Sequence, residues 1–179
     1  MNPRDSLRQE HGTIMKMLAV LQKFFAKPMD LKDGEAGDLE ALIEFFEIYV
    51  DRYHHVKEER HLFPALSRAR TPDIDSLVKS LIDDHCQARE DMEQIKSHAV
   101  AIQSCAGVDG NEFSETARRY VDLVRKHIRK ENSELLPLIE ETLSEIERLQ
   151  MSGQFDDLEE TILGPNGLET FLAGLRTLY

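Results

Sequence analysis

Two segments of the sequence repeat the same pair of metal-binding side chains at the same spacing. The first runs from His54 through Glu58 to Pro64, and the second from His127 through Glu131 to Pro137. In each segment a glutamate follows the histidine by four residues and a proline follows it by ten. On an α-helix, residues four apart lie on one face, about 40° apart around the axis. Each segment therefore presents a nitrogen and an oxygen donor to one point, which is the geometry of a metal site.

Two further histidines interrupt the apolar stripes of other predicted helices. His11 and His85 each occupy a position where the three-four spacing of apolar residues leads us to expect a core side chain. Each precedes one of the two His-x-x-x-Glu segments, by 43 residues in the first half and by 42 in the second. The two halves of the sequence thus resemble one another. The predicted metal ligands are His11, His54, Glu58, His85, His127 and Glu131.

The number of donors indicates two ions with open positions. Two six-coordinate ions offer about twelve positions, of which four histidines and two bridging glutamates fill about eight. A structural metal site is normally closed, so the open positions favour the binding of a small ligand. Nitrogen and oxygen donors suit iron, manganese or zinc, so the donor set predicts two ions of one of these metals.

The helices that must position these residues can be read from apolar periodicity and from breaks at Pro and Gly. We expect long helices over residues 3–27, 39–69, 72–104 and 112–149, with loops at 28–38 and 107–111. Pro64 should kink or interrupt the second helix just past its candidate ligands. Ser152-Gly153 predicts a break before a shorter helix at 155–163 and a last turn or two ending at Tyr179.

This pattern predicts an all-α protein, an antiparallel up-down four-helix bundle with an additional C-terminal helical segment. A chain of 179 residues fits a single domain, with residues 1–150 as the bundle and 151–179 as the extension. Charged residues make up 31% of the chain, there are only nine glycines, and there is no tryptophan, which favours a helix-rich fold.

The net charge and the apolar runs limit the partners that we expect. A formal charge of −12 should repel nucleic acid and anionic lipid. We find no signal peptide and no apolar run near the roughly twenty residues that cross a bilayer, so we expect a cytoplasmic protein with no membrane partner. The sequence does not indicate a redox partner or an oligomeric state.

Taken together, these motifs resemble the hemerythrin-like, or HHE cation-binding, family over nearly the whole chain. The resemblance is carried by Glu10-His11, by His54–Glu59 with Leu62-Phe63-Pro64, by Asp84-His85, and by His127-x-x-x-Glu131 with Pro137. It implies a non-haem di-iron centre in a four-helix bundle that binds or reacts with O2, NO or peroxide. Oxygen-carrying members have a second histidine one turn from the first on the third helix, where this chain has Leu81 and Arg89. The resemblance therefore favours sensing, stress response or iron handling over oxygen transport.

Several neighbouring residues stay outside the predicted ligand set. On an α-helix His55 is rotated about 100° from His54, so we expect His55 and Glu59 to face solvent or to lie behind the ligands. For Glu10 and Asp84 we favour surface exposure over contact with a ligand. Whether His61, Tyr120, Glu47 or Glu134 contributes to the site stays open.

The predicted function is a non-haem di-iron protein that binds or senses a small diatomic ligand or peroxide. One alternative is a redox enzyme that reduces peroxide, NO or O2 at the same centre. Another is a helical interaction module with a structural metal such as zinc.

Overall fold

The computed structural model describes residues 1–25, 35–103, 110–164, 171 and 173, and these form helices joined by short turns. No strand occurs within these ranges. The elements are α1 (Pro3–Phe25), α2 (Glu35–Glu44), η1 (Phe45–His55), η2 (Glu58–Leu62), α3 (Phe63–Ser67), α4 (Pro72–Gln103), α5 (Gly110–Lys130), η3 (Glu131–Leu135), α6 (Leu136–Thr142) and α7 (Glu145–Leu163), where η denotes a π-helix.

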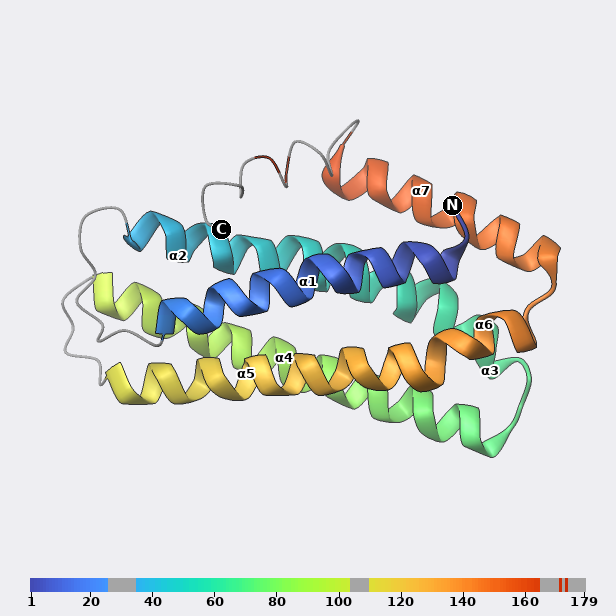
Figure 1. The fold of residues 1–179 in the computed structure, drawn as a ribbon, viewed down its shortest axis with the longest axis horizontal. Coiled ribbons are helices and arrows are strands. Elements are labelled where there is room, and N and C mark those ends of the chain that lie inside the picture. The colour runs from blue at the N-terminus through green and yellow to red at the C-terminus, as the bar shows by residue number, and fades with distance from the viewer. Residues whose placement is uncertain (26–34, 104–109, 165–170, 172, 174–179) are drawn as a thin grey trace.

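Four long helical rods build the bundle. They are α1, the continuous run from α2 to α3, α4, and the run from α5 to α6, and successive rods point in opposite directions (Figure 1). Helix α7 lies along the outside and contacts α1, η1 and η2. The predicted all-α bundle with an additional C-terminal helix is therefore confirmed.

A polar layer divides the apolar core of the bundle into two parts. One apolar cluster includes Ile14, Val50, Ile95 and Val124, and the other includes Leu7, Leu62, Leu81 and Leu135. Both clusters follow from the three-four apolar spacing, which gives each rod one inward face. Between them, every rod contributes at least one buried histidine. The bundle therefore holds its polar side chains at mid-length, enclosed by apolar packing on both sides.

The boundaries of α1 and α4 match the predictions. Helices α2 and α5 begin at Glu35 and Gly110, inside the predicted loops at 28–38 and 107–111, and the boundaries near the C-terminus also differ. Gly153 lies inside α7, and the chain breaks instead at Leu143 and Ser144, so the predicted break at Ser152-Gly153 is wrong. Ser144 Oγ accepts a hydrogen bond from Glu147 N at 3.3 Å, and Glu147 Oε2 accepts one from Ser144 N at 2.9 Å. This capping box starts α7, whereas an isolated glycine costs a helix only about 1 kcal/mol. Residues 26–34, 104–109 and most of 165–179, which include much of both predicted loops and the predicted last turn, lie outside the described residues.

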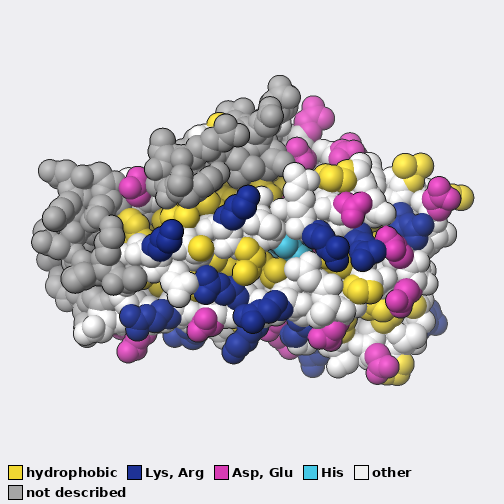
Figure 2. All heavy atoms as spheres, in the orientation of Figure 1, with side chains coloured by type: hydrophobic (Ala, Val, Ile, Leu, Met, Phe, Trp, Pro, Cys, Tyr) yellow, Lys and Arg dark blue, Asp and Glu magenta, His cyan; other side chains and the backbone are white. Residues whose placement is uncertain are grey.

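The surface of the bundle is charged and mixed. Figure 2 shows acidic and basic side chains interspersed across one face of the molecule. Among the helices that the structure describes, none is both long enough and apolar enough to cross a membrane.

Candidate metal centre

The four predicted histidine ligands share one orientation, with Nδ1 turned towards an oxygen atom and Nε2 turned towards the centre of the bundle. The Nδ1 distances are 3.1 Å from His11 to Asn132 Oδ1, 2.8 Å from His54 to Glu10 Oε2, 2.7 Å from His85 to Glu59 Oε1 and 3.5 Å from His127 to Asp84 Oδ2. For His11, His54 and His85 this acceptor fixes the proton at Nδ1 and orients the ring, as it does for metal-bound histidines. His127 Nδ1 lies close to Asp84 but makes no hydrogen bond among the described residues. The Nε2 lone pairs are then available to a cation.

The two predicted glutamates lie between these rings and have no solvent exposure. Glu58 Oε2 is 3.9 Å from His54 Nε2 and 3.4 Å from His85 Nε2. Glu131 Oε2 is 3.1 Å from His11 Nε2, and Glu131 Oε1 is 3.0 Å from His127 Nε2. Each carboxylate therefore contacts one histidine from each half of the chain.

These contacts define two groups of candidate ligands that share both carboxylates. The groups are His11, His54, Glu58 and Glu131, and Glu58, His85, His127 and Glu131, and in each group the donor atoms lie within 4.8 Å of one another. The shared glutamates are placed to bridge two cations. The six residues predicted from the sequence are thus brought together in one cluster.

Unsatisfied polar atoms show that these residues fit a metal. Among the described residues, no hydrogen-bond partner is found for the carboxylate oxygens of Glu58 and Glu131 or for Nε2 of His11 and His54. Although His11 Nε2 lies 3.1 Å from Glu131 Oε2, the contact lacks the angle of a hydrogen bond. Burying carboxylates without partners is strongly unfavourable, and cations at this position would remove that penalty.

The electrostatics of the cluster also favour positive charge. Burial lowers the pKa of His127, but the charge of Glu131 and the nearby Asp84 carboxylate outweigh burial and raise this pKa to about 10. Burial likewise opposes the raised pKa of His11, which its contact with Glu131 produces. For Glu131 burial favours a higher pKa, but the positive charge on His127 holds the pKa well below its usual range. A bound cation would take the place of these protons.

Wide helical turns coincide with the candidate ligands. η1 ends at His55, η2 begins at Glu58 and η3 begins at Glu131. η2 and η3 each end two residues before a proline, at Pro64 and Pro137. Because proline has no N–H and its ring clashes with the carbonyl four residues earlier, the preceding turn widens. Short π-helical turns are frequent at functional sites, and here the turns of η2 and η3 follow from the repeated proline.

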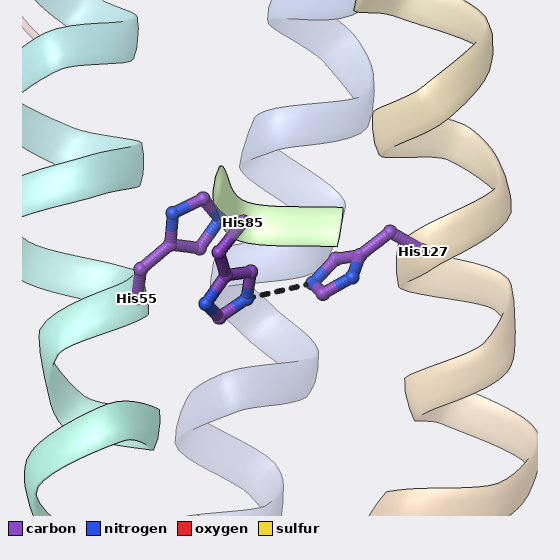
Figure 3. Close-up of side chains that lie close together, drawn as sticks. All are labelled: His55, His85 and His127. Carbon is purple, nitrogen blue, oxygen red and sulfur yellow. Dashed lines mark hydrogen bonds between the residues drawn. The ribbon is translucent and has the colours of Figure 1, made fainter. Parts of the chain in front are cut away.

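His55 lies at the site as well, so of the two positions expected for it, facing solvent or lying behind the ligands, the first is wrong. It is 2% exposed, and its ring stacks on the ring of His85 with centroids 3.8 Å apart and planes at 16° (Figure 3). His55, His85 and His127 form a third candidate group, and the Nε2 atoms of the last two are 3.1 Å apart. A π-helical turn holds more residues than an α-helical turn, so adjacent residues are rotated less and both His54 and His55 face inward.

Glu10 is another buried residue that sequence reasoning placed at the surface. Only 3% of it is exposed, and its Oε1 accepts hydrogen bonds from Lys57 Nζ at 2.7 Å and from Ser6 Oγ at 2.9 Å. Lys57 is 1% exposed, and its Nζ lies 3.7 Å from the centre of the Tyr53 ring. The position of Glu10 directly before His11 was a signal that Glu10 could lie at the site. Its buried partner Lys57 lies 47 residues further along the chain, so the sequence alone does not show the pair.

Four residues whose contribution to the site the sequence left undecided lie outside the three candidate groups. They are His61, Tyr120, Glu47 and Glu134. His61 packs edge-on against Phe155 of α7, and Glu134 is exposed. Glu47 pairs with a lysine of α4, and the ring of Tyr120 packs edge-on against Phe46 in the core. Glu59 and Asp84 lie behind the histidines, where each carboxylate approaches an Nδ1 atom.

Comparison with known proteins agrees with this geometry. Residues 2–139 match the hemerythrin HHE cation-binding domain. The chain belongs to the hemerythrin HHE cation-binding family. The match contains all six predicted ligands and ends before α7 begins.

The individual relatives share low sequence identity with this chain and are longer than it. Uncharacterized proteins of Mycobacterium tuberculosis and Mycobacterium bovis are 21% identical over 169 residues, which cover 94% of this chain and 65% of theirs. A DNA nickase of Nostoc is 28% identical over 157 residues, which cover 87% of this chain and 38% of its own length. The chain therefore spans less than two thirds of the curated relatives that it matches.

Proposed function

We propose that this protein holds two iron ions in the cluster and binds or senses a small diatomic ligand or peroxide at them. The observation that supports this best is the orientation of four histidines, each with Nδ1 close to an oxygen atom and Nε2 directed at two shared, buried carboxylates. Iron supplies the redox and ligand-binding chemistry, and the protein supplies the oriented donors. Manganese or zinc would bind the same donors.

The number of donors supports a ligand-binding role over a structural one. Four histidines and two bridging carboxylates leave about four of about twelve positions open on two six-coordinate ions. A structural zinc site would be closed by protein side chains. Sensing, stress response and iron handling are the roles that we propose for a centre of this kind.

The remaining part of the proposal concerns location and macromolecular partners. Cys86 is a free and exposed thiol in the described part of the chain, which suits the reducing conditions of the cytoplasm. With a net charge of −12, we propose that the chain does not bind nucleic acid. The Nostoc relative is named a DNA nickase, but this name belongs to a longer protein, of which this chain matches 38% of the length.

Metal analysis and an optical spectrum test the proposal directly. Purified protein should contain about two irons per chain and develop near-ultraviolet absorption when the ferrous form is exposed to air. His54→Ala should lower the iron content to about one per chain or less, because it removes one donor and its link to Glu10. His98→Ala is the matched control, since His98 is half-buried and packs against Phe113 away from the cluster.

Two results would contradict the proposal. Protein that stays free of iron after anaerobic reconstitution would refute the di-iron assignment, and zinc at full occupancy would favour the structural role. If iron binds, steady-state consumption of peroxide or NO with a supplied reductant would show turnover in place of reversible binding.

A further inference from the structure

A cavity of about 230 Å³ opens beside the metal centre between η1, α4 and α5. Its walls combine five apolar or aromatic side chains with His55 and five charged ones. The apolar and aromatic residues are Phe46, Val50, Ala88, Met92 and Tyr120, and the charged ones are Glu47, Asp51, Arg52, Arg89 and Glu93. Of the histidines and glutamates clustered at the centre, His55 is the one that also lines this cavity. The buried imidazole of His55 therefore separates the cavity from the candidate metal ligands.

The orientation of His55 suits a hydrogen bond better than a metal bond. An imidazole lone pair lies in the plane of its ring, and the rings of His55 and His85 are stacked almost parallel (Figure 3). Two parallel rings 3.8 Å apart cannot both direct a lone pair at one ion. His55 Nδ1 is buried, has no hydrogen-bond partner among the described residues, and lies 3.5 Å from Asp51 Oδ1, another lining residue.

The charged side chains nearest His55 are paired with one another. Arg89 Nε donates to Asp51 Oδ1 at 2.5 Å, and Arg89 Nη2 donates to Glu59 Oε1 at 2.7 Å. The single positive charge of Arg89 is shared by two carboxylates, so an anion in the cavity would lose water without gaining an unpaired positive charge here, which disfavours it. The cavity is also smaller than the roughly 300–1,000 Å³ of pockets for drug-sized ligands. Its shape and chemistry suit uncharged molecules of a few atoms.

We propose that this cavity is the route by which a small uncharged ligand reaches the metal centre, and that His55 hydrogen-bonds the ligand at its inner end. The proposal rests on the proposed function, because it assumes that a small ligand binds at the centre. His55 is then a residue that positions the ligand, in addition to the six candidate metal ligands.

Filling the cavity tests the route. Ala88→Phe places a ring in the cavity from α4, and Ala117→Phe is its control, since Ala117 is a buried alanine on α5 that lines a separate cavity of about 220 Å³. Xenon needs no metal, so in metal-free protein it should shift the amide NMR signals of residues 46–51. Ala88→Phe should abolish these shifts and Ala117→Phe should preserve them.

Rates of NO binding to the ferrous, iron-containing protein test the same route at the centre. Ala88→Phe should slow association and dissociation by roughly tenfold each, because one path serves both directions, whereas Ala117→Phe should stay within about twofold of the wild type. Circular dichroism and iron content should be unchanged in both variants. If wild-type protein binds NO and Ala88→Phe binds it at the wild-type rate, the route is wrong.

Substitution of His55 tests the hydrogen bond. His55→Phe should keep the iron content and raise the dissociation rate of NO or O2 by up to about tenfold, the effect of one hydrogen bond. His55→Gln retains a donor and should restore much of the slow dissociation. Loss of iron from His55→Phe would make His55 a metal ligand and overturn the positioning role. Wild-type protein that holds iron but binds neither gas would instead refute the proposed function, while xenon in the cavity would still report on the cavity alone.

Discussion

Replacing Lys57 with methionine should destabilise the metal-free protein and disturb the candidate ligand His54. Lys57 is 1% exposed, and its ammonium group lies 2.7 Å from Glu10 Oε1. The other oxygen of Glu10 accepts a hydrogen bond from His54 Nδ1 at 2.8 Å. Methionine has a similar length and no charge, so Lys57→Met leaves the Glu10 carboxylate buried without its cation.

The expected loss of stability depends on the hydrogen-bond partners that Glu10 keeps in Lys57→Met. Removing one member of a buried ion pair costs about 3–5 kcal/mol, because the other charge is left uncompensated. Ser6 and His54 still donate to Glu10, so we expect the lower end, about 3 kcal/mol. For a chain of this length, that corresponds to a fall in Tm of about 6–12 °C.

The effect should also depend on pH. Burial raises the pKa of Glu10, but the hydrogen bond from His54 and the charge of Lys57 outweigh burial and lower this pKa to about 2. A lowered pKa in the folded state means that the stability gained from the ionised carboxylate is present above the ordinary pKa of 4.5 and is lost as the pH falls towards 2. Removing Lys57 raises the folded-state pKa of Glu10, so in Lys57→Met this contribution should be smaller and its loss should be complete at a higher pH.

Thermal unfolding of metal-free protein, followed by circular dichroism, is the assay. Lys96→Met is the matched control, since Lys96 pairs with Glu47 at 2.5 Å on the surface, where solvent screens the pair, and it should change Tm far less. The double variant Lys57→Met with Glu10→Gln should recover part of the loss because no buried charge remains. A Tm for Lys57→Met within error of the wild type, or a double variant less stable than the single one, would refute this reasoning.

Four further predictions concern the cluster and α7. Metal binding at pH 8 should release about one proton or more per chain, measured by calorimetry in buffers of different ionisation enthalpy, because the pKa of His127 is about 10 in the metal-free fold. Binding heats that do not change with the buffer would contradict this proton release. Because the same pKa is raised in the folded state, metal-free protein should lose stability as the pH rises from 6.5 to about 10. Glu131→Gln should lower the pKa of His127 towards its ordinary value in an NMR titration, and an unchanged pKa would exclude Glu131 as the cause. Ser144→Ala removes the cap of α7 and should lower Tm by about 2–4 °C, whereas Ser133→Ala, on an exposed turn of η3, should not.

Two of the failed predictions concern side chains that are buried in the structure, His55 and Glu10. His55 and Glu10 were placed towards solvent by assuming 3.6 residues per turn and average exposure. The π-helical η1 changes the rotation per residue, so His55 faces the interior beside His54. The repeated prolines at Pro64 and Pro137 explain the wide turns of η2 and η3, but η1 ends nine residues before Pro64, so they gave no signal for His55.

The break before α7 has a different explanation. Ser144-x-x-Glu147 is a capping box that can be read directly from the sequence, but the glycine nine residues later was given more weight. A cap satisfies backbone groups at a helix start, whereas one glycine only lowers helix stability slightly. The capping box therefore predicts the start of α7 correctly, whereas Gly153 does not mark a boundary.

The sequence by itself determined the donor set, its duplication and the bundle, because these depend on residue type and on spacing within single helices. Only the tertiary structure decided that Lys57 meets Glu10, that His55 stacks on His85, and that a cavity ends at His55. These contacts join different rods, and helical periodicity gives the inward face of a rod but not its rotation or height relative to its neighbours. The physical reason is that packing between rods, together with the wide turns before the prolines, sets which side chains finally meet.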